Sequence, residues 1–208
     1  MKSYLTVGRN ASFRLTERKS VFIGNIFRTE SDEAAAAAIA GVRDMYPDAR
    51  HNVYAYILRQ GNMSRYTDDG EPHGTAGMPV LQVLRGRQLT DCTVVVTRYF
   101  GGVLLGTGGL VRAYTEAASG ACDAAGTVRM TPCVFVRIRS GYTDYQKIRS
   151  IVSRAGGTER ETEYGDSVTA EYSIDSERAE AVLAAVADQT SARATAETVG
   201  SGYAELAE

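Results

Sequence analysis

The chain has 208 residues, of which 44% are hydrophobic, 23% are charged and only four are proline. This composition excludes wholesale disorder, and the length allows one large domain or two small ones. The net charge of −2 provides no overall positive field for nonspecific binding to nucleic acid. Three cysteines without a CxxC pair argue against a disulfide scaffold, and we see neither a secretory signal nor a membrane-length apolar run. We therefore expect a cytoplasmic protein that does not enter a membrane.

The first part of the chain alternates β-type segments with helical patterns. Its expected elements are short β-segments at 21–23 and 26–27 on either side of Gly24-Asn25, a helix from Ser31 to about Pro47, a strand at 53–58, a helix from Met78 to about Gly86, a strand at 92–100, and a helix capped by Thr107. The three valines at the centre of the 92–100 strand indicate burial on both faces.

Residues 59–79 interrupt this pattern with four glycines and two prolines among polar side chains. We interpret the segment as one long irregular loop. Loops of this length in a compact domain are usually functional or disordered. The loop is therefore the first place to search for a site.

A domain boundary is expected after Thr131-Pro132, where the excess of basic side chains changes to an excess of acidic ones. This divides the chain into domains 1–132 and 133–208. The sequence of the second domain predicts a strand at 134–138, a helix capped by Thr143-Asp144, strands at 158–163 and 167–174, a helix that begins at Ser176, and a strand at 193–199. The order β-α-β-β-α-β is that of a ferredoxin-like domain.

The first candidate site is the strand, glycine loop and helix from Arg98 to Arg112. Unpaired N–H groups at a helix N-terminus attract anions, and glycines allow a phosphate to come close to them. Gly101 to Thr107 has the spacing of a Walker A loop but lacks its lysine, so a tight turn that packs the helix on the sheet is the alternative. The candidate phosphate- or nucleic-acid-binding residues are Arg98, Tyr99, Gly101, Gly102, Gly106, Thr107, Gly108, Gly109 and Arg112.

The second candidate is the acidic loop Asp68-Asp69-Gly70-Glu71. Its three carboxylates are possible Mg²⁺ ligands or a general base, but they also suit hydrogen bonds that order the loop, or a plain turn. We expect this loop to lie beside the glycine loop, because each adjoins a strand end. The supporting residues are Arg65, Asp68, Asp69, Gly70, Glu71, Thr75 and Gly77, and the weak metal candidates are Asp68, Asp69 and Glu71.

Other catalytic constellations are not supported by the sequence. His51 and His73 are the only histidines, no GxSxG elbow is present, and Cys92 and Cys122 lie in apolar stretches. We interpret both histidines as polar residues near loops. Aromatic side chains beside arginines, such as Tyr99 and Phe100 after Arg98, suit base stacking as well as ordinary core and rim packing.

Two long motifs, SRYTDDGEPHGTAGMP at 64–79 and VVVTRYFGGVLLGTGGLVRAY at 94–114, closely resemble the Impact family and its bacterial, two-domain YigZ-type branch. The resemblance implies an α+β fold. Its N-terminal domain would be like the second domain of a small-subunit ribosomal protein, and its ferredoxin-like C-terminal domain like the fifth domain of elongation factor G. It carries over Asp68, Asp69, Gly70, Glu71, Thr75, Ala76, Gly77, Arg98, Tyr99, Gly101, Gly102 and 106–109 as motif residues, with no catalytic residue among them.

We therefore predict a non-enzymatic cytoplasmic protein that associates with RNA or the ribosome and regulates translation, with no cofactor. One alternative is a Mg²⁺-dependent enzyme, or a binder of a nucleotide or another phosphorylated small molecule. Another is a protein-interaction module that acts through the acidic C-terminal domain. The sequence alone leaves these three open.

Overall fold

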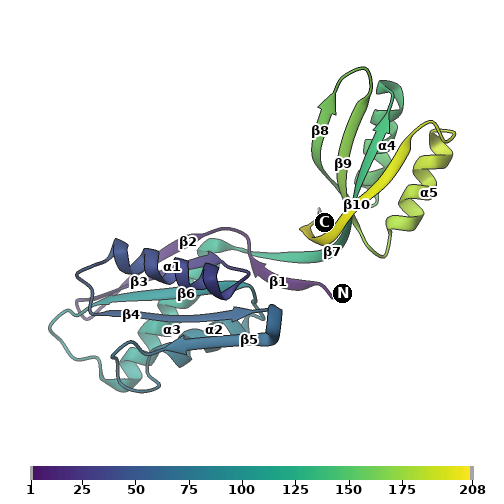
Figure 1. The fold of residues 1–208 in the computed structure, drawn as a ribbon. Coiled ribbons are helices and arrows are strands. Elements are labelled where there is room, and N and C mark those ends of the chain that lie inside the picture. Colours follow the sequence, from purple (N-terminus) through teal and green to yellow (C-terminus); the bar gives the residue numbers. More distant parts are fainter. Residues whose placement is uncertain (1, 207–208) are drawn as a thin grey trace. The chain divides into compact units, whose positions relative to one another are not determined.

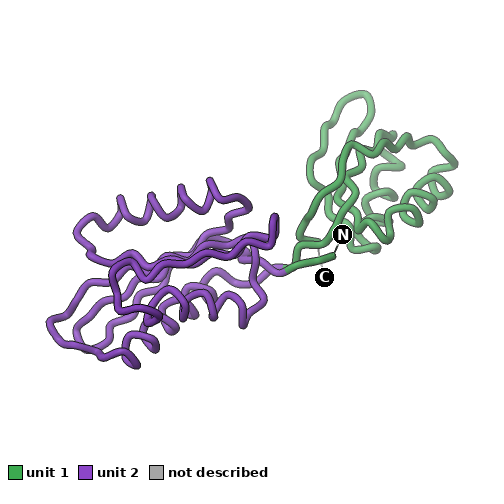
Figure 2. Tube along the Cα trace, turned by 60° about the horizontal axis from the view of Figure 1, so that its bottom comes forward, with its two compact units in different colours: residues 1–4, 129–208 green, residues 5–128 purple. Residues whose placement is uncertain are grey.

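The computed structural model describes residues 2–206, which form two compact units. One unit spans residues 5–128, and the other joins the N-terminal residues up to Tyr4 with the chain from Arg129 onward (Figure 2). The boundary expected at 132/133 falls inside a strand, β7 (Thr127–Ser140). Within residues 2–206, no helix is both long enough and apolar enough to cross a bilayer.

The 5–128 unit is an antiparallel sheet between helices, and its strand order is β2-β3-β6-β4-β5 (Figure 1). Helix α1 covers one face of the sheet, and α2 and α3 cover the other. The elements are β1 (Tyr4–Val7), β2 (Ala11–Glu17), β3 (Ser20–Arg28), α1 (Asp32–Met45), β4 (His51–Leu58), the 3₁₀ turn η1 (Gln60–Asn62), β5 (Met63–Thr67), α2 (Gly77–Gly86), β6 (Cys92–Tyr99) and α3 (Gly106–Ala125).

The central strand β6 is buried on both faces, as its valines predict. Val94 and Val96 pack into the core beneath α2 and α3, while Val95 packs with α1 on the opposite face. A strand buried in this way places its C-terminal residues in the interior until the sheet ends. Arg98, near that end, is accordingly a buried charge.

Three expectations for this unit are wrong. The segments at 21–23 and 26–27 form one strand, β3, because Gly24-Asn25 pairs with β2 on one side and β6 on the other. A Cβ at Gly24 would lie 2.5 Å from the carbonyl oxygen of Ala117, so this glycine lets α3 pack closely on the sheet. The segment 59–79 is not a single loop, because it contains η1 and β5. Thr107 does not cap α3, whose N-cap is Leu105 without a side-chain hydrogen bond.

The other helix signals of this unit are confirmed. The Ser31 side chain accepts a hydrogen bond from the Ala34 N–H and caps α1. Helix α2 ends at Gly86, as its apolar spacing predicts.

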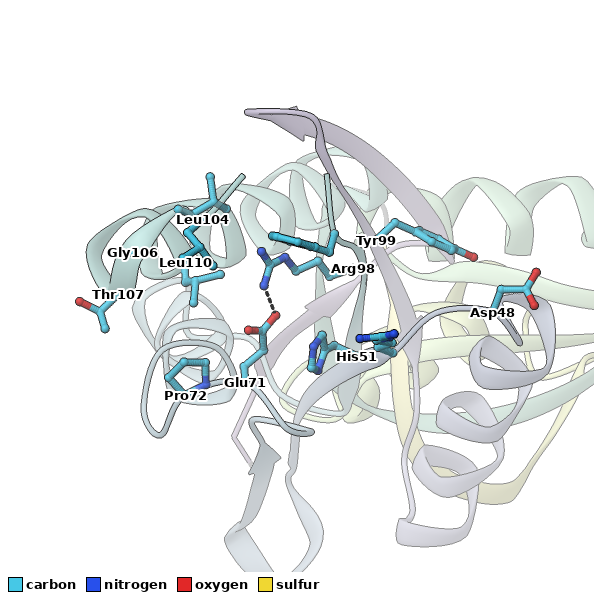
Figure 3. Close-up of a pocket in the computed structure, with 13 residues that line it drawn as sticks. Asp48, His51, Glu71, Pro72, Arg98, Tyr99, Leu104, Gly106, Thr107 and Leu110 are labelled. Atoms are coloured by element: carbon cyan, nitrogen blue, oxygen red, sulfur yellow. Dashed lines mark hydrogen bonds and ion pairs between the residues drawn. The ribbon is translucent and has the colours of Figure 1, made fainter. Parts of the chain in front are cut away.

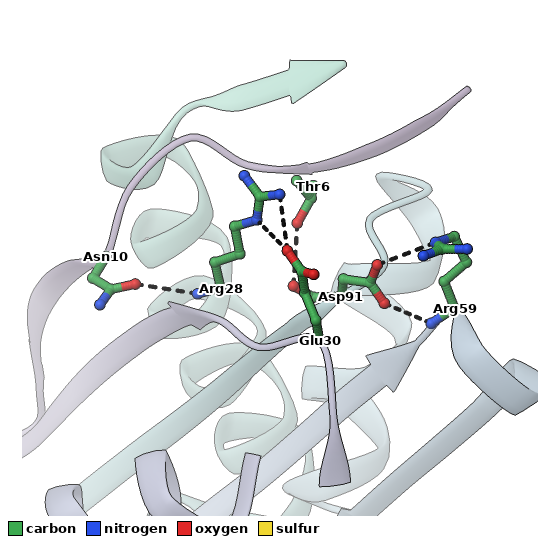
Figure 4. Close-up of polar contacts among 6 residues, drawn as sticks. All are labelled: Thr6, Asn10, Arg28, Glu30, Arg59 and Asp91. Atoms are coloured by element: carbon green, nitrogen blue, oxygen red, sulfur yellow. Dashed lines mark hydrogen bonds and ion pairs between the residues drawn. The ribbon is translucent and has the colours of Figure 1, made fainter. Parts of the chain in front are cut away.

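Buried Asp91 joins segments that are distant in the sequence (Figure 4). Its carboxylate accepts the backbone N–H of Arg59 at 2.7 Å. Its carbonyl oxygen accepts the Thr6 hydroxyl at 3.2 Å and the Thr29 N–H at 3.0 Å. Asp91, which lies between α2 and β6 in the sequence, thus joins the ends of β1, β3 and β4.

The second unit has the expected order β-α-β-β-α-β, and its strands run β10-β7-β9-β8 with β1 also beside β7. Helices α4 and α5 bury residues such as Ile148 and Val182 against the sheet. The predicted Thr143-Asp144 cap is wrong, because Gly141 is the N-cap and Asp144 pairs with Arg193 at 2.9 Å. The elements are β7, α4 (Tyr142–Arg154), β8 (Thr158–Tyr164), β9 (Val168–Asp175), α5 (Ala179–Gln189) and β10 (Thr195–Glu205).

Candidate functional site

A buried ion pair lies where the two candidate loops meet. The Arg98 guanidinium donates to Glu71 at 2.6 Å, and the Tyr114 hydroxyl donates to the same oxygen at 2.8 Å. The side chains of Arg98 and Glu71 are only 7% and 3% exposed. Burial and the adjacent Glu71 carboxylate raise the pKa of Tyr114 far above its usual value, so its hydroxyl stays a donor.

The guanidinium of Arg98 also has an unused donor. Its Nε is buried and has no hydrogen-bond partner among residues 2–206. The rings of Phe22 and Phe100 flank the guanidinium carbon at 5.4 and 5.6 Å from their centroids. A buried arginine of this kind is held in place on several sides, with its charge balanced by Glu71.

Beside this pair is a cavity of about 710 Å³, which we call the α3 cavity. In Figure 3, Arg98, Glu71 and His51 lie next to one another, and the start of α3 lies across from them. The wall of the α3 cavity has four parts. They are the end of β6 with Arg98, Tyr99 and the following Phe100; residues 104–107 and Leu110 at the start of α3; Glu71 of the acidic loop and the adjacent Pro72; and Asp48, Arg50 and the first residue of β4, His51. The expectation that the two loops lie side by side is therefore confirmed.

The first turn of α3 gives this cavity its polarity. The first N–H groups of a helix have no partner within it and carry the positive end of the helix dipole. The 20-residue helix has no acidic residue in its first turn. Gly106 and Thr107, at this end, line the cavity together with exposed Arg50. The hydrocarbon side chains of Leu104, Leu105 and Leu110 form an apolar part of the wall beside Gly106 and Thr107.

The carboxylates of the acidic loop each have separate donors. Asp68 accepts backbone N–H groups of Gly74, Ala76 and Gly77, at 2.8 to 3.2 Å, and so holds the start of α2. Burial alone would raise the pKa of Asp68, but these three donors hold it below its usual value. Asp69 accepts the Asn52 N–H at 2.6 Å and pairs with Arg43 at 3.2 Å.

The three carboxylates of the acidic loop contact separate donors and do not converge on one point, as the ligands of a metal ion would. No group of three or more histidine, cysteine or acidic side chains among residues 2–206 is arranged to hold a metal ion. Asp68 faces backbone groups, Asp69 faces β4 and α1, and Glu71 faces Arg98. The geometry gives the three carboxylates loop-ordering contacts rather than a shared centre.

Two glycines of the motifs are required by close backbone approach. A Cβ at Gly77 would lie 2.4 Å from the carbonyl oxygen of Thr67, and one at Gly101 would lie 2.0 Å from the carbonyl carbon of Lys19. Thr75 supports the same loop, because its hydroxyl donates to the Pro72 carbonyl at 2.6 Å. These contacts fix the shape of the two loops around the cavity.

Not every predicted site residue lies at the cavity. Arg112 is exposed on α3 and is not part of the wall, and Arg65 on β5 lies near Asp32, 3.7 Å away. His73 is 99% exposed. The predicted residues in the wall are Glu71, Arg98, Tyr99, Gly106 and Thr107.

Sequence reasoning missed three polar contributors. Tyr114 has the spacing of a core residue on α3, so nothing in the sequence marks its hydroxyl as a partner of Glu71. Arg50 precedes β4 and His51 begins it, and the pairing of His51 with Arg98 across β4 and β6 brings them to the cavity. A histidine just before a buried strand was the available signal.

The fold and the site together define a two-unit α+β protein with a ligand-sized cavity in its first unit. The family model for the Impact N-terminal domain matches residues 18–122, and a model for a domain of unknown function, DUF1949, matches residues 138–193. The chain therefore belongs to the Impact family.

The relatives extend over both units. The chain is 34% identical over 176 residues to the IMPACT family member YvyE of Bacillus subtilis (strain 168). The aligned region covers 84% of this chain and 81% of the relative. It is 39% identical over 143 residues to the IMPACT family member YigZ of Escherichia coli (strain K12), covering 67% and 70%. A crystal structure of a hypothetical protein matches with a TM-score of 0.62 and 31% identity, over 96% of this chain and 98% of the other.

Proposed function

We propose that this protein is a non-catalytic, cytoplasmic binding protein that associates with RNA and acts on translation. The observation that carries the proposal is the α3 cavity, whose wall joins the N-terminus of a helix to exposed Arg50 and to the buried Arg98. A helix N-terminus binds phosphate without a dedicated lysine. Membership of the Impact family is consistent with a regulatory rather than a catalytic role.

The cavity offers complementary groups for both parts of a nucleotide. The α3 N-terminus and the exposed Arg50 are suited to a phosphate, because both present positive charge. Phe100 is 56% exposed beside them and presents an aromatic face on which a base can stack. Binding through one local site does not require a basic protein, so it is compatible with a net charge of −2.

The link to translation rests on the family resemblance. That resemblance implies domains like those of a small-subunit ribosomal protein and of elongation factor G. We expect the protein in cell extract to sediment with ribosomes or RNA, and nuclease treatment to release it. Slow sedimentation with and without nuclease would count against the translation link.

The RNA site is tested by the pair Thr107→Asp and Thr107→Asn. Both replacements are close to threonine in size, but only Asp places a negative charge in the first turn of α3, at the cavity wall. An acidic residue in this position stabilises a helix, so lost binding cannot be attributed to a weakened α3. Fluorescence anisotropy with labelled single-stranded RNA should show roughly tenfold weaker binding for Thr107→Asp, which corresponds to about 1.4 kcal/mol. Thr107→Asn should bind like the wild type.

Salt dependence gives a second readout. Few phosphates can contact one helix terminus and one arginine, so the affinity should fall only weakly with salt, with a slope of about −1 to −2 in a double-logarithmic plot. Equal RNA affinity for Thr107→Asp and the wild type would refute this placement of the site.

A free nucleotide or another phosphorylated small molecule is the second candidate ligand. It is favoured by the cavity volume of about 710 Å³, which falls within the range of about 300–1,000 Å³ that is common for small-molecule sites. Displacement of labelled RNA by free nucleotides distinguishes the two. Complete displacement at micromolar concentrations would favour the small ligand, and none at millimolar concentrations would favour RNA.

A further inference from the structure

We infer that the α3 cavity selects ribonucleotides over deoxyribonucleotides through an acceptor nitrogen of His51. This inference rests on the proposed function and deepens it, because it names the chemical group that the site recognises. It depends on the orientation of one histidine ring and on what that ring leaves available to a ligand.

The hydrogen bond of His51 fixes which ring nitrogen carries the proton. Its Nδ1 lies 2.8 Å from the carbonyl oxygen of Asp69. A carbonyl oxygen can only accept, so Nδ1–H is the donor. In the neutral imidazole Nε2 is then the acceptor. The His51 ring forms no other hydrogen bond among residues 2–206.

The surrounding structure holds this ring in place. His51 is the first residue of β4 and pairs with Arg98 of β6 in the sheet. On its Nδ1 side the ring lies beside Gly70, where a Cβ would be 3.4 Å from Nδ1, at ordinary van der Waals distance. Asp69, whose carbonyl oxygen accepts this hydrogen bond, is itself fixed through its carboxylate by the Asn52 N–H and Arg43. The ring is therefore oriented by the acidic loop while it lines the α3 cavity (Figure 3).

The Nε2 acceptor of His51 is complementary to a ligand group that donates a hydrogen bond. A phosphodiester has no donor, so it cannot satisfy Nε2, and the helix N-terminus and Arg50 are its partners instead. The 2′-hydroxyl of ribose is a donor close to the phosphate, and deoxyribose lacks it. The cavity thus presents a cationic end for the phosphate and an acceptor for the sugar.

The test compares uridine oligonucleotides that share one base and differ only at the 2′ position. Labelled strands of about 12 nucleotides carry 2′-hydroxyl, 2′-deoxy or 2′-fluoro groups. The 2′-fluoro strand keeps an RNA-like sugar shape but cannot donate a hydrogen bond. With the wild-type protein we expect the RNA to bind about three- to tenfold more tightly than both other strands.

Three variants locate the preference. His51→Phe keeps a planar ring without the acceptor and should bind all three strands alike, at the affinity that the wild type has for the deoxy strand. His51→Gln keeps an amide oxygen acceptor and should retain part of the preference. His73→Phe is the matched control, because His73 is 99% exposed and lies outside the cavity wall. It should behave like the wild type, and circular dichroism confirms that each variant is folded.

The possible outcomes distinguish a failure of the ribose selectivity from a failure of RNA binding itself. Equal binding of the three strands by the wild type overturns the ribose selectivity and leaves RNA binding standing. Tight binding of the 2′-fluoro strand would show that sugar shape, rather than a donated hydrogen bond, is recognised, and would also overturn it. A preference that persists in His51→Phe removes His51 from the explanation. Absence of binding to every strand overturns the proposed function, and this inference with it.

Discussion

The buried pair of Arg98 and Glu71 is the contact on which the shape of the α3 cavity depends most. Glu71→Ala removes the only carboxylate that the Arg98 guanidinium contacts among residues 2–206, and it removes the acceptor of the Tyr114 hydroxyl. Both donors are buried in the intact protein and lose a charged acceptor that a neutral water molecule does not equal. We expect this substitution to destabilise the 5–128 unit strongly.

The magnitude follows from the burial of both charges. Breaking a buried ion pair by removing one partner costs about 3–5 kcal/mol, because the remaining charge stays uncompensated in a medium of low polarity. Tyr114→Phe is the graded control, since it removes one neutral donor and should cost about 0.5–1.5 kcal/mol. The Arg98→Met/Glu71→Leu double variant removes both charges and should be more stable than Glu71→Ala alone.

The three cysteines allow each unit to be measured separately. Cys92 and Cys122 are buried in the 5–128 unit, and Cys133 is buried in the other. A short pulse of a thiol reagent at increasing urea concentrations, followed by peptide mass spectrometry, reports the unfolding of each unit from its own cysteines. Glu71→Ala should lower the urea midpoint for Cys92 and Cys122 and leave that for Cys133 unchanged.

Two results would contradict this reasoning. A loss below about 1 kcal/mol would mean that the pair contributes little more than a surface ion pair. An equal shift at Cys133 would mean that the substitution acts on the whole chain rather than on the cavity.

Two further predictions concern the loops around the cavity. The pKa of Asp68 is held low in the folded state, so its contribution to stability is present above the ordinary carboxyl pKa and is lost as the pH falls through the lowered value. Asp68→Asn should therefore be less stable than the wild type at neutral pH, and urea midpoints of the two proteins should converge on acidification. Parallel curves down to about pH 2 would contradict this. Gly101→Ala places a Cβ against the backbone of Lys19 and should cost about 1–3 kcal/mol. Gly41→Ala, in open space on α1, should instead gain about 0.5–1 kcal/mol, and a loss there would show that the assay does not isolate the clash.

Much of the fold could be predicted because its signals are local. The valines of β6, the Ser31 cap of α1 and the alternation in β7 and β9 each follow from periodicity or capping within a few residues. The strand β5 was missed because Met63–Thr67 lies between polar, glycine-rich stretches and is an edge strand, paired with β4 on one side. An edge strand has a weaker apolar pattern than a buried strand, so its sequence resembles that of a loop.

The site could be predicted only in part, for a related reason. The glycine loop and the acidic loop are visible as motifs, but their partners come from the opposite side of the sheet or from the core face of a helix. Tyr114 is indistinguishable from a core residue until its hydroxyl is seen to meet Glu71. The sequence predicts that Arg98 takes part in phosphate binding, but the register of β6 buries this residue and Glu71 balances its charge.

This balance changes where the attraction for a ligand comes from. Because Arg98 and Glu71 compensate each other, the attraction for a phosphate is assigned to the α3 N-terminus and to Arg50, which shares the wall with Asp48, while Nε2 of His51 adds an acceptor. A site of this kind attracts one phosphate locally and leaves recognition to hydrogen bonds and stacking. Under the proposed function, a protein with an almost neutral net charge would discriminate among nucleic acids through this local site, without a broad electrostatic surface.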